Sequence, residues 1–156
     1  MNEFNVLAVV ISLCALIVAV VGHEIMHGLA ALYYGDYTAK AAGRLSVNPI
    51  KHIDLIGSII LPLGLLAFNA PFIFGFAKPV PVNIREVIKN GGYNAAIIVS
   101  LAGVAYNFLL AILAFMLLKS GIISQDGVVA ILHIFLVILI TINIMLGFFN
   151  LLPIPP

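Results

Sequence analysis

The stretch VLAVVISLCALIVAVVGHEIMHGLAALY, residues 6–33, decides the architecture of this 156-residue chain. It is longer than the roughly 20 apolar residues that an α-helix needs to cross a bilayer. No basic residue precedes it, Glu3 lies near the start of the chain, and the stretch is too long for a cleavable signal peptide. We therefore expect it to stay in the protein as a spanning helix.

The composition of the whole chain agrees with a membrane protein. Hydrophobic residues make up 63% of the sequence and charged residues only 8%, far from the composition of a soluble domain. Residues 93–118 and 128–152 are two further apolar runs that are long enough to span. A net charge of +1, with the Lys and Arg dispersed in loops, excludes nucleic-acid binding. We predict an all-α integral membrane protein in which residues 1–156 form a single membrane-embedded core.

A fourth apolar segment, residues 53–76, is broken by residues that interrupt regular helices. These are Pro62, Gly64, Asn69 and Pro71. Breaks of this kind are tolerated at membrane depth where protein or a wet cavity surrounds them. The flanking loops, residues 37–52 and 77–92, are both basic, so the positive-inside rule places both in the cytoplasm. We therefore favour a re-entrant hairpin over the alternative, a kinked fourth span.

The hairpin fixes the predicted orientation of the other segments in the cell membrane. The N-terminus is outside, the first helix runs inward, and the last helix runs inward parallel to it. The second half of the first helix then lies nearer the cytoplasmic face. Any functional group in that half is expected on the cytoplasmic side of this multi-pass protein.

Three ionisable side chains lie within that half of the first helix. His23 and His27 are four residues apart, so a helix places both imidazoles on one face with the spacing that grips one zinc ion. Glu24 projects beside them and could act on a water molecule. The alternative is a pair of neutral histidines hydrogen-bonded across helices. Burial of three such groups is costly in a membrane, and a bound metal compensates for it, so we predict one zinc ion per chain.

Four stretches of the sequence carry a resemblance to a known family. They are HEIMHGLAALYYGDYTAKAAGRLSVNPIKHID, FGFAKPVPVN, SLAGVAYN and FNLLPIPP. From about residue 20 to the C-terminus the chain resembles the site-2 proteases, intramembrane zinc metalloproteases, in their short bacterial form. The resemblance implies that His23 and His27 bind zinc, that Glu24 is catalytic, and that Asn150 helps to hold substrate or to stabilise the reacting carbonyl. It also implies a transmembrane protein as substrate.

The sequence departs from the family pattern at the third zinc ligand. The family's ligand is the aspartate of an LDG motif, and the sequence stops at Pro156, two positions short of it. We expect the ligand beyond Pro156 in a longer chain. The carboxylates of Asp36 and Asp54 lie near the same membrane face, but neither matches the family's ligand.

Other features have plainer interpretations. Asn107 is expected to hydrogen-bond across a close helix contact, in preference to a direct substrate contact. His52 is expected to be a solvated loop residue, and His133 is too far from Asn150 to be a ligand. The rival function is a non-catalytic zinc-binding membrane protein, or a pseudoprotease that binds spanning helices. The sequence decides neither the substrate, nor the cleavage position, nor whether the chain forms a homo-oligomer.

Overall fold

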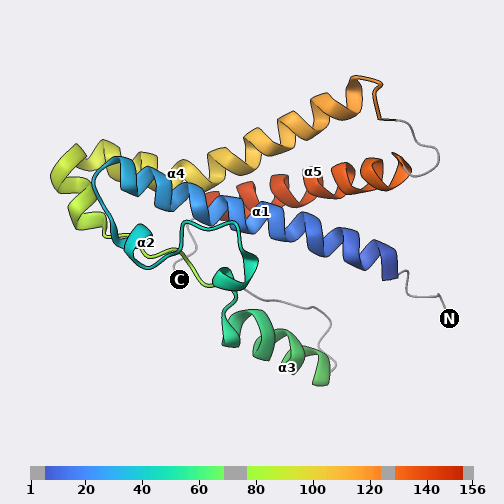
Figure 1. Cartoon of the computed structure of the whole chain (residues 1–156), viewed down its shortest axis with the longest axis horizontal. Helices are drawn as coiled ribbons and strands as arrows, with labels where there is room; N and C mark the ends of the chain where they lie inside the picture. Colours follow the sequence, from blue (N-terminus) through green and yellow to red (C-terminus); the bar gives the residue numbers. More distant parts are fainter. Residues whose placement is uncertain (1–5, 69–76, 124–128, 153–156) are drawn as a thin grey trace. The chain divides into compact units, whose positions relative to one another are not determined.

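A computed structural model describes residues 6–68, 77–123 and 129–152, which form helices joined by loops (Figure 1). Three helices are long and apolar enough to cross a membrane, namely α1 (Val6–Tyr33), α4 (Ile84–Lys119) and α5 (Val129–Leu151). The described residues contain no β-strand. The predicted all-α architecture with three spanning helices is confirmed.

The boundaries of α4 differ from those that the sequence predicted. The helix begins at Ile84 instead of Tyr93, and it is interrupted at Gly92, where φ is 69° and ψ is −171°. This backbone conformation is open almost only to glycine, because a Cβ atom would clash there. Gly92 therefore separates a short polar helical piece from the apolar piece that follows it.

The chain divides into two compact units. One consists of Met1–Met26 and Ser100–Pro156, and the other of His27–Val99. We call them the three-helix unit and the loop unit. The first contains most of α1, most of α4 and all of α5, whereas the second contains the end of α1, the start of α4 and the segment of the chain between them.

The three-helix unit is held together by small and aliphatic side chains from all three helices. Its buried cluster consists of Ala15 from α1, Ala114 from α4, and Leu136 and Leu139 from α5. Small residues let helices approach closely and increase their van der Waals contact. In a bilayer this packing drives helix association, because lipid tails are as apolar as the side chains and the hydrophobic effect contributes little. Within this unit α1 and α5 run in the same direction and α4 runs against them (Figure 1). The predicted parallel arrangement of the first and last helices agrees with this.

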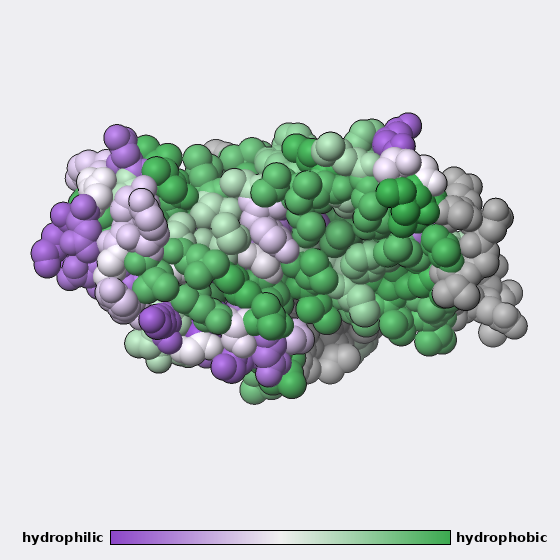
Figure 2. Space-filling model, turned by 45° about the horizontal axis from the view of Figure 1, so that its top comes forward, coloured by the Kyte–Doolittle hydropathy of each residue, from purple (hydrophilic) through white to green (hydrophobic). Residues whose placement is uncertain are grey.

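The outer faces of these helices are apolar. Figure 2 shows hydrophobic residues over most of one face of the protein. Large side chains that are more than half exposed occur on each spanning helix, for example Leu13, Met116 and Phe148. A soluble monomer does not expose hydrophobic surface on this scale. The exposed faces fit contact with lipid.

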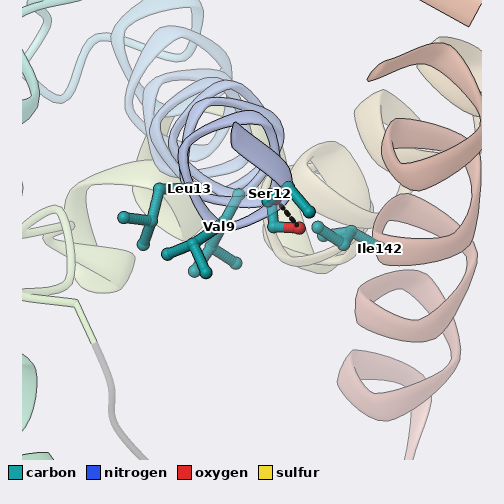
Figure 3. A pocket seen from close by; sticks show the side chains of 6 residues that line it. Val9, Ser12, Leu13 and Ile142 are labelled. Atoms are coloured by element: carbon teal, nitrogen blue, oxygen red, sulfur yellow. Dashed lines mark hydrogen bonds between the residues drawn. The ribbon is translucent and has the colours of Figure 1, made fainter. Parts of the chain in front are cut away.

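A shallow hollow of about 350 Å³ lies on the three-helix unit between the first half of α1 and α5. It is lined by Ala8, Val9, Ser12, Leu13, Leu16 and Ile142, of which four are labelled in Figure 3. The one hydroxyl among them, that of Ser12, donates to the backbone oxygen of Ala8 at 2.8 Å. The hollow therefore presents hydrocarbon and offers no group for chemistry.

In the loop unit, the broken apolar segment is only partly described. A short helix α2 (Thr38–Ala41) and a 3₁₀ turn (Pro49–His52) precede it. A π-helical turn (Leu55–Ile60) and α3 (Leu61–Ala67) follow, with 6 and 7 residues respectively. Together these are shorter than the roughly 20 residues that a span requires. Residues 69–76 lie outside the described part of the chain, so the choice between hairpin and fourth span stays a prediction.

Residues 77–83 form an irregular segment that is tied to the rest of the loop unit. The backbone N–H of Lys78 donates to the carbonyl of His52 at 2.9 Å, and the guanidinium of Arg44 donates to the carbonyls of Lys78 and Pro79. His52 is 3% exposed, and one of its ring nitrogens lies 2.8 Å from the carbonyl of Ser46. The expectation of a solvated His52 is wrong: its side chain is buried, in a part of the loop unit where Lys78, distant in sequence, bonds to its backbone.

Asp36 anchors the other end of this segment. Its carboxylate is 2% exposed and accepts hydrogen bonds from the backbone N–H (2.9 Å) and hydroxyl (2.5 Å) of Thr38 and from the backbone N–H of Asn83 (2.6 Å). Burial alone would raise the pKa of this carboxyl. The three hydrogen bonds favour the ionised form, and together they lower the pKa from its ordinary value of 3.8.

We expect Asp36→Ala to destabilise the loop unit by about 2 kcal/mol at neutral pH, because two N–H groups and a hydroxyl lose a charged acceptor. The folded-state pKa is lowered, so this stabilisation is complete above about pH 4 and is lost as the pH falls through the folded-state value. Thermal unfolding in detergent at pH 7 and pH 3 measures both effects. Glu86→Gln removes only an exposed pair with Lys89 and serves as the control. A pH-independent difference between Asp36→Ala and the wild type would contradict the assignment.

Candidate metal centre

The helix α1 carries all three ionisable residues of the HExxH motif. It is continuous from Val6 to Tyr33, so His23 and His27 lie one turn apart on the same side of the helix. His23 is 7% exposed, and Glu24 and His27 are half-buried. This is the arrangement that the sequence predicted. The hydrogen bonds of each imidazole decide whether it can bind a metal.

The ring of His23 is held by an amide from α4. Its Nδ1 lies 2.5 Å from Oδ1 of Asn107 within the three-helix unit. An amide oxygen can only accept a hydrogen bond, so Nδ1 carries the proton and donates it. A neutral imidazole that is protonated on Nδ1 has its lone pair on Nε2. His23 can therefore offer Nε2 to a metal.

The ring of His27 is held in the same way by the main chain. Its Nδ1 lies 2.7 Å from the backbone carbonyl oxygen of Val99 within the loop unit. Because a carbonyl oxygen is also only an acceptor, His27 is protonated on Nδ1 and has its lone pair on Nε2. A ligating histidine almost always donates its other ring N–H to such an oxygen. Both histidines thus fit zinc binding through Nε2.

A chain of buried amides continues behind His23. Nδ2 of Asn107 donates to Oδ1 of Asn143 on α5 at 2.7 Å and to the backbone oxygen of Ala19 at 3.4 Å. Nδ2 of Asn143 donates to the backbone oxygen of Leu139 at 2.8 Å. Both asparagines are 0% exposed. The predicted hydrogen bond of Asn107 across helices is confirmed. The role of Asn143 was missed, although a buried amide in so apolar a helix is itself a signal.

Asn150 lies near the end of α5 and is exposed. Its side-chain N–H donates to the backbone oxygen of Leu146 at 2.8 Å, one turn earlier in the same helix. It follows Asn143 by seven residues, about 10 Å along the helix. The hydrogen bond leaves the amide oxygen of Asn150 as an acceptor. Its role toward substrate stays a prediction.

The other candidate ligands, Asp36, Asp54 and His133, have hydrogen-bonding environments that differ from those of His23 and His27. Asp36 is bound to Thr38 and Asn83, as described above, and Asp54 accepts from the backbone N–H groups of Ile56 and Gly57 at the start of the π-helical turn. His133 lies in the first turns of α5, and its buried Nδ1 has no hydrogen-bond partner among the described residues. Within residues 6–68, 77–123 and 129–152, no group of three or more His, Cys, Asp and Glu could hold a metal.

Comparison with known proteins gives an independent indication. Over 145 residues the chain is 41% identical to the protein named "Putative zinc metalloprotease YwhC" of Bacillus subtilis (strain 168). The match covers 90% of this chain and 62% of that protein, so the chain spans less than two thirds of its relative's length. No family model matches the chain, and no solved structure matches it. The chain is thus a relative of a protein that is named as a zinc metalloprotease, which suggests a metalloprotease family.

Proposed function

We propose that this chain is the core of an intramembrane zinc endopeptidase of the site-2 protease type, which hydrolyses a peptide bond in or near a transmembrane segment of another protein. One observation carries the proposal. Both imidazoles of an HExxH motif on a membrane-spanning helix donate their Nδ1 protons to oxygen acceptors, so the metal-binding lone pair of each ring is on Nε2. The named relative supports the protease class.

Each residue of the motif has a distinct task in this reaction. His23 and His27 would hold the zinc through Nε2, and the family resemblance implies a third protein ligand. When bound, zinc lowers the pKa of a water molecule toward about 7 and polarises a carbonyl. Glu24 follows His23 directly on α1 and is half-buried. As general base it takes the proton of the attacking water and passes it to the leaving amine.

Asn150 completes the proposed site as a hydrogen-bond donor to the substrate. In the resting state its amide N–H donates to the carbonyl of Leu146 on its own helix. An exposed side chain can exchange this bond for one to the scissile carbonyl. A donor aimed at the developing negative charge is worth a large factor in rate. We place this chemistry toward the cytoplasmic side of the cell membrane, as the distribution of basic residues indicates.

The proposal is tested with the full-length protein, purified in detergent without chelator and supplied with zinc. The substrate is a model protein with one transmembrane segment, and mass spectrometry of the fragments maps the cut. We expect zinc-dependent cleavage inside the apolar segment or at its edge. Stoichiometric zinc with no cleavage across a panel of such substrates would overturn the proposal and favour the non-catalytic zinc protein. Cleavage confined to soluble peptides would overturn the intramembrane assignment.

A further inference from the structure

We infer that Asn143 is a positioning residue for zinc binding: through Asn107 it fixes which nitrogen of His23 carries the lone pair that binds the metal. This inference rests on the proposed function, because it assigns a task to α5 at the same metal site. All of its contacts lie within the three-helix unit. They form one chain of hydrogen bonds that begins at Leu139 on α5 and ends at His23 on α1.

The direction of this chain is set at its first bond. The acceptor there is the backbone carbonyl of Leu139, which has no proton to give, so the group of Asn143 that faces it is the NH₂. The side-chain oxygen of Asn143 must then face Asn107. An oxygen at that place requires the NH₂ of Asn107 opposite it.

The same logic reaches the imidazole. Since the NH₂ of Asn107 faces α5, its Oδ1 faces His23, 2.5 Å from Nδ1. That oxygen accepts only a protonated Nδ1, which leaves the lone pair on Nε2. If the amide of Asn107 were reversed, it would present an N–H to Nδ1 and favour the tautomer whose proton blocks Nε2. Asn143 therefore selects the metal-binding tautomer of His23 through two successive hydrogen bonds, one from Asn107 to Asn143 and one from His23 to Asn107.

Two acceptors favour the same orientation of the Asn107 amide, because both bind its NH₂ group, and their distances rank them. The oxygen of Asn143 accepts at 2.7 Å, whereas the backbone oxygen of Ala19 accepts at 3.4 Å. A bond of 3.4 Å is longer than the usual range of N–H···O bonds and is correspondingly weak. Asn143 thus supplies most of the orientation, and Ala19 retains a part when Asn143 is removed. Loss of Asn143 should weaken zinc binding less than loss of Asn107.

The test uses the full-length protein with two readouts, the zinc dissociation constant from chelator competition and the tautomer of His23 from ¹⁵N NMR of the metal-free protein. Partners of a ligating histidine typically contribute 10- to 100-fold to metal affinity. We expect Asn107→Leu to weaken zinc binding within that range and Asn143→Leu to weaken it about tenfold. In Asn143→Leu, a mixture of tautomers should replace the Nδ1-protonated form of His23.

Two further variants separate this role from general packing. Asn143→Asp, neutral when buried, keeps a donor toward Leu139 and an acceptor toward Asn107, so it should restore both readouts. Thr141→Val removes an exposed hydroxyl of α5 that bonds only within its own helix, and it should change neither. Wild-type affinity in Asn143→Leu would overturn the inference alone, whereas absence of zinc from the wild type would overturn the proposed function. If Asn143→Leu does not fold, the tautomer in the wild type decides, and a proton on Nε2 of His23 would refute the inference.

Discussion

Glu24→Gln is expected to abolish peptide hydrolysis while the protein keeps its zinc. Glutamine has nearly the same shape as glutamate but cannot accept a proton at neutral pH, so the variant lacks the general base. A positioned general base contributes about 10²- to 10⁴-fold to the rate. Glu24 is not one of the two proposed ligands, so metal affinity should change little. Initial rates of cleavage of the model substrate and zinc content by elemental analysis measure the two effects.

The control for this experiment is Glu86→Gln. Glu86 lies in the loop unit, is partly exposed and forms a surface ion pair with Lys89 at 3.6 Å. Glu86→Gln is the same chemical change at a position outside the proposed site, so we expect this variant to keep full activity. Equal activity of Glu24→Gln and the wild type would remove Glu24 from the mechanism. Loss of zinc together with activity would instead make Glu24 a ligand or a support of one.

His27→Ala is expected to remove zinc from the purified protein and activity with it. The substitution takes away one of two ligands on α1 and leaves the carbonyl of Val99 without its donor. Catalytic zinc is normally held by three protein ligands and a water molecule, so the loss of one ligand weakens binding by orders of magnitude. Zinc content after dialysis without chelator, compared with that of the wild type, gives the result. Removal of zinc from the wild type by a chelator should abolish activity reversibly.

His133→Ala provides the matched control for the loss of an intramembrane imidazole. His133 lies ten residues before Asn143 on α5, about 15 Å along the helix. It carries the same side chain within a spanning helix but has no part in the proposed site. Zinc content and cleavage should therefore stay at the wild-type level. Stoichiometric zinc in His27→Ala would contradict the assignment of His27 as a ligand.

The spanning helices could be predicted from the sequence because their length and apolar character do not depend on tertiary contacts. The predicted α1 matches the structure, and α5 agrees within one residue at each end. The early start of α4 could not be predicted. Its first piece is short and polar, so its sequence looks like that of a loop. The structure shows instead a helical piece that ends at Gly92, where φ is positive.

The placement of His23 and His27 on one side of α1 could also be predicted, since a spacing of four residues needs only a helix. The groups that hold the two imidazoles could not be predicted. Asn107 lies 84 residues from His23 and Val99 lies 72 residues from His27, so only the packing of α4 brings these acceptors to the rings. The burial of His52 could not be predicted either, because it also depends on contacts between segments that are distant in sequence. The third zinc ligand stays a prediction.

The two imidazoles are supported by different kinds of oxygen, one from a side chain and one from the main chain. Replacing the amino acid at position 107 can erase the first support in a single codon change. No replacement at position 99 erases the second, because every amino acid there supplies the same carbonyl. As sequences diverge, the tautomer of His23 is therefore kept only if selection retains the side chain at position 107. The tautomer of His27 is kept for as long as the backbone of α4 stays helical at position 99.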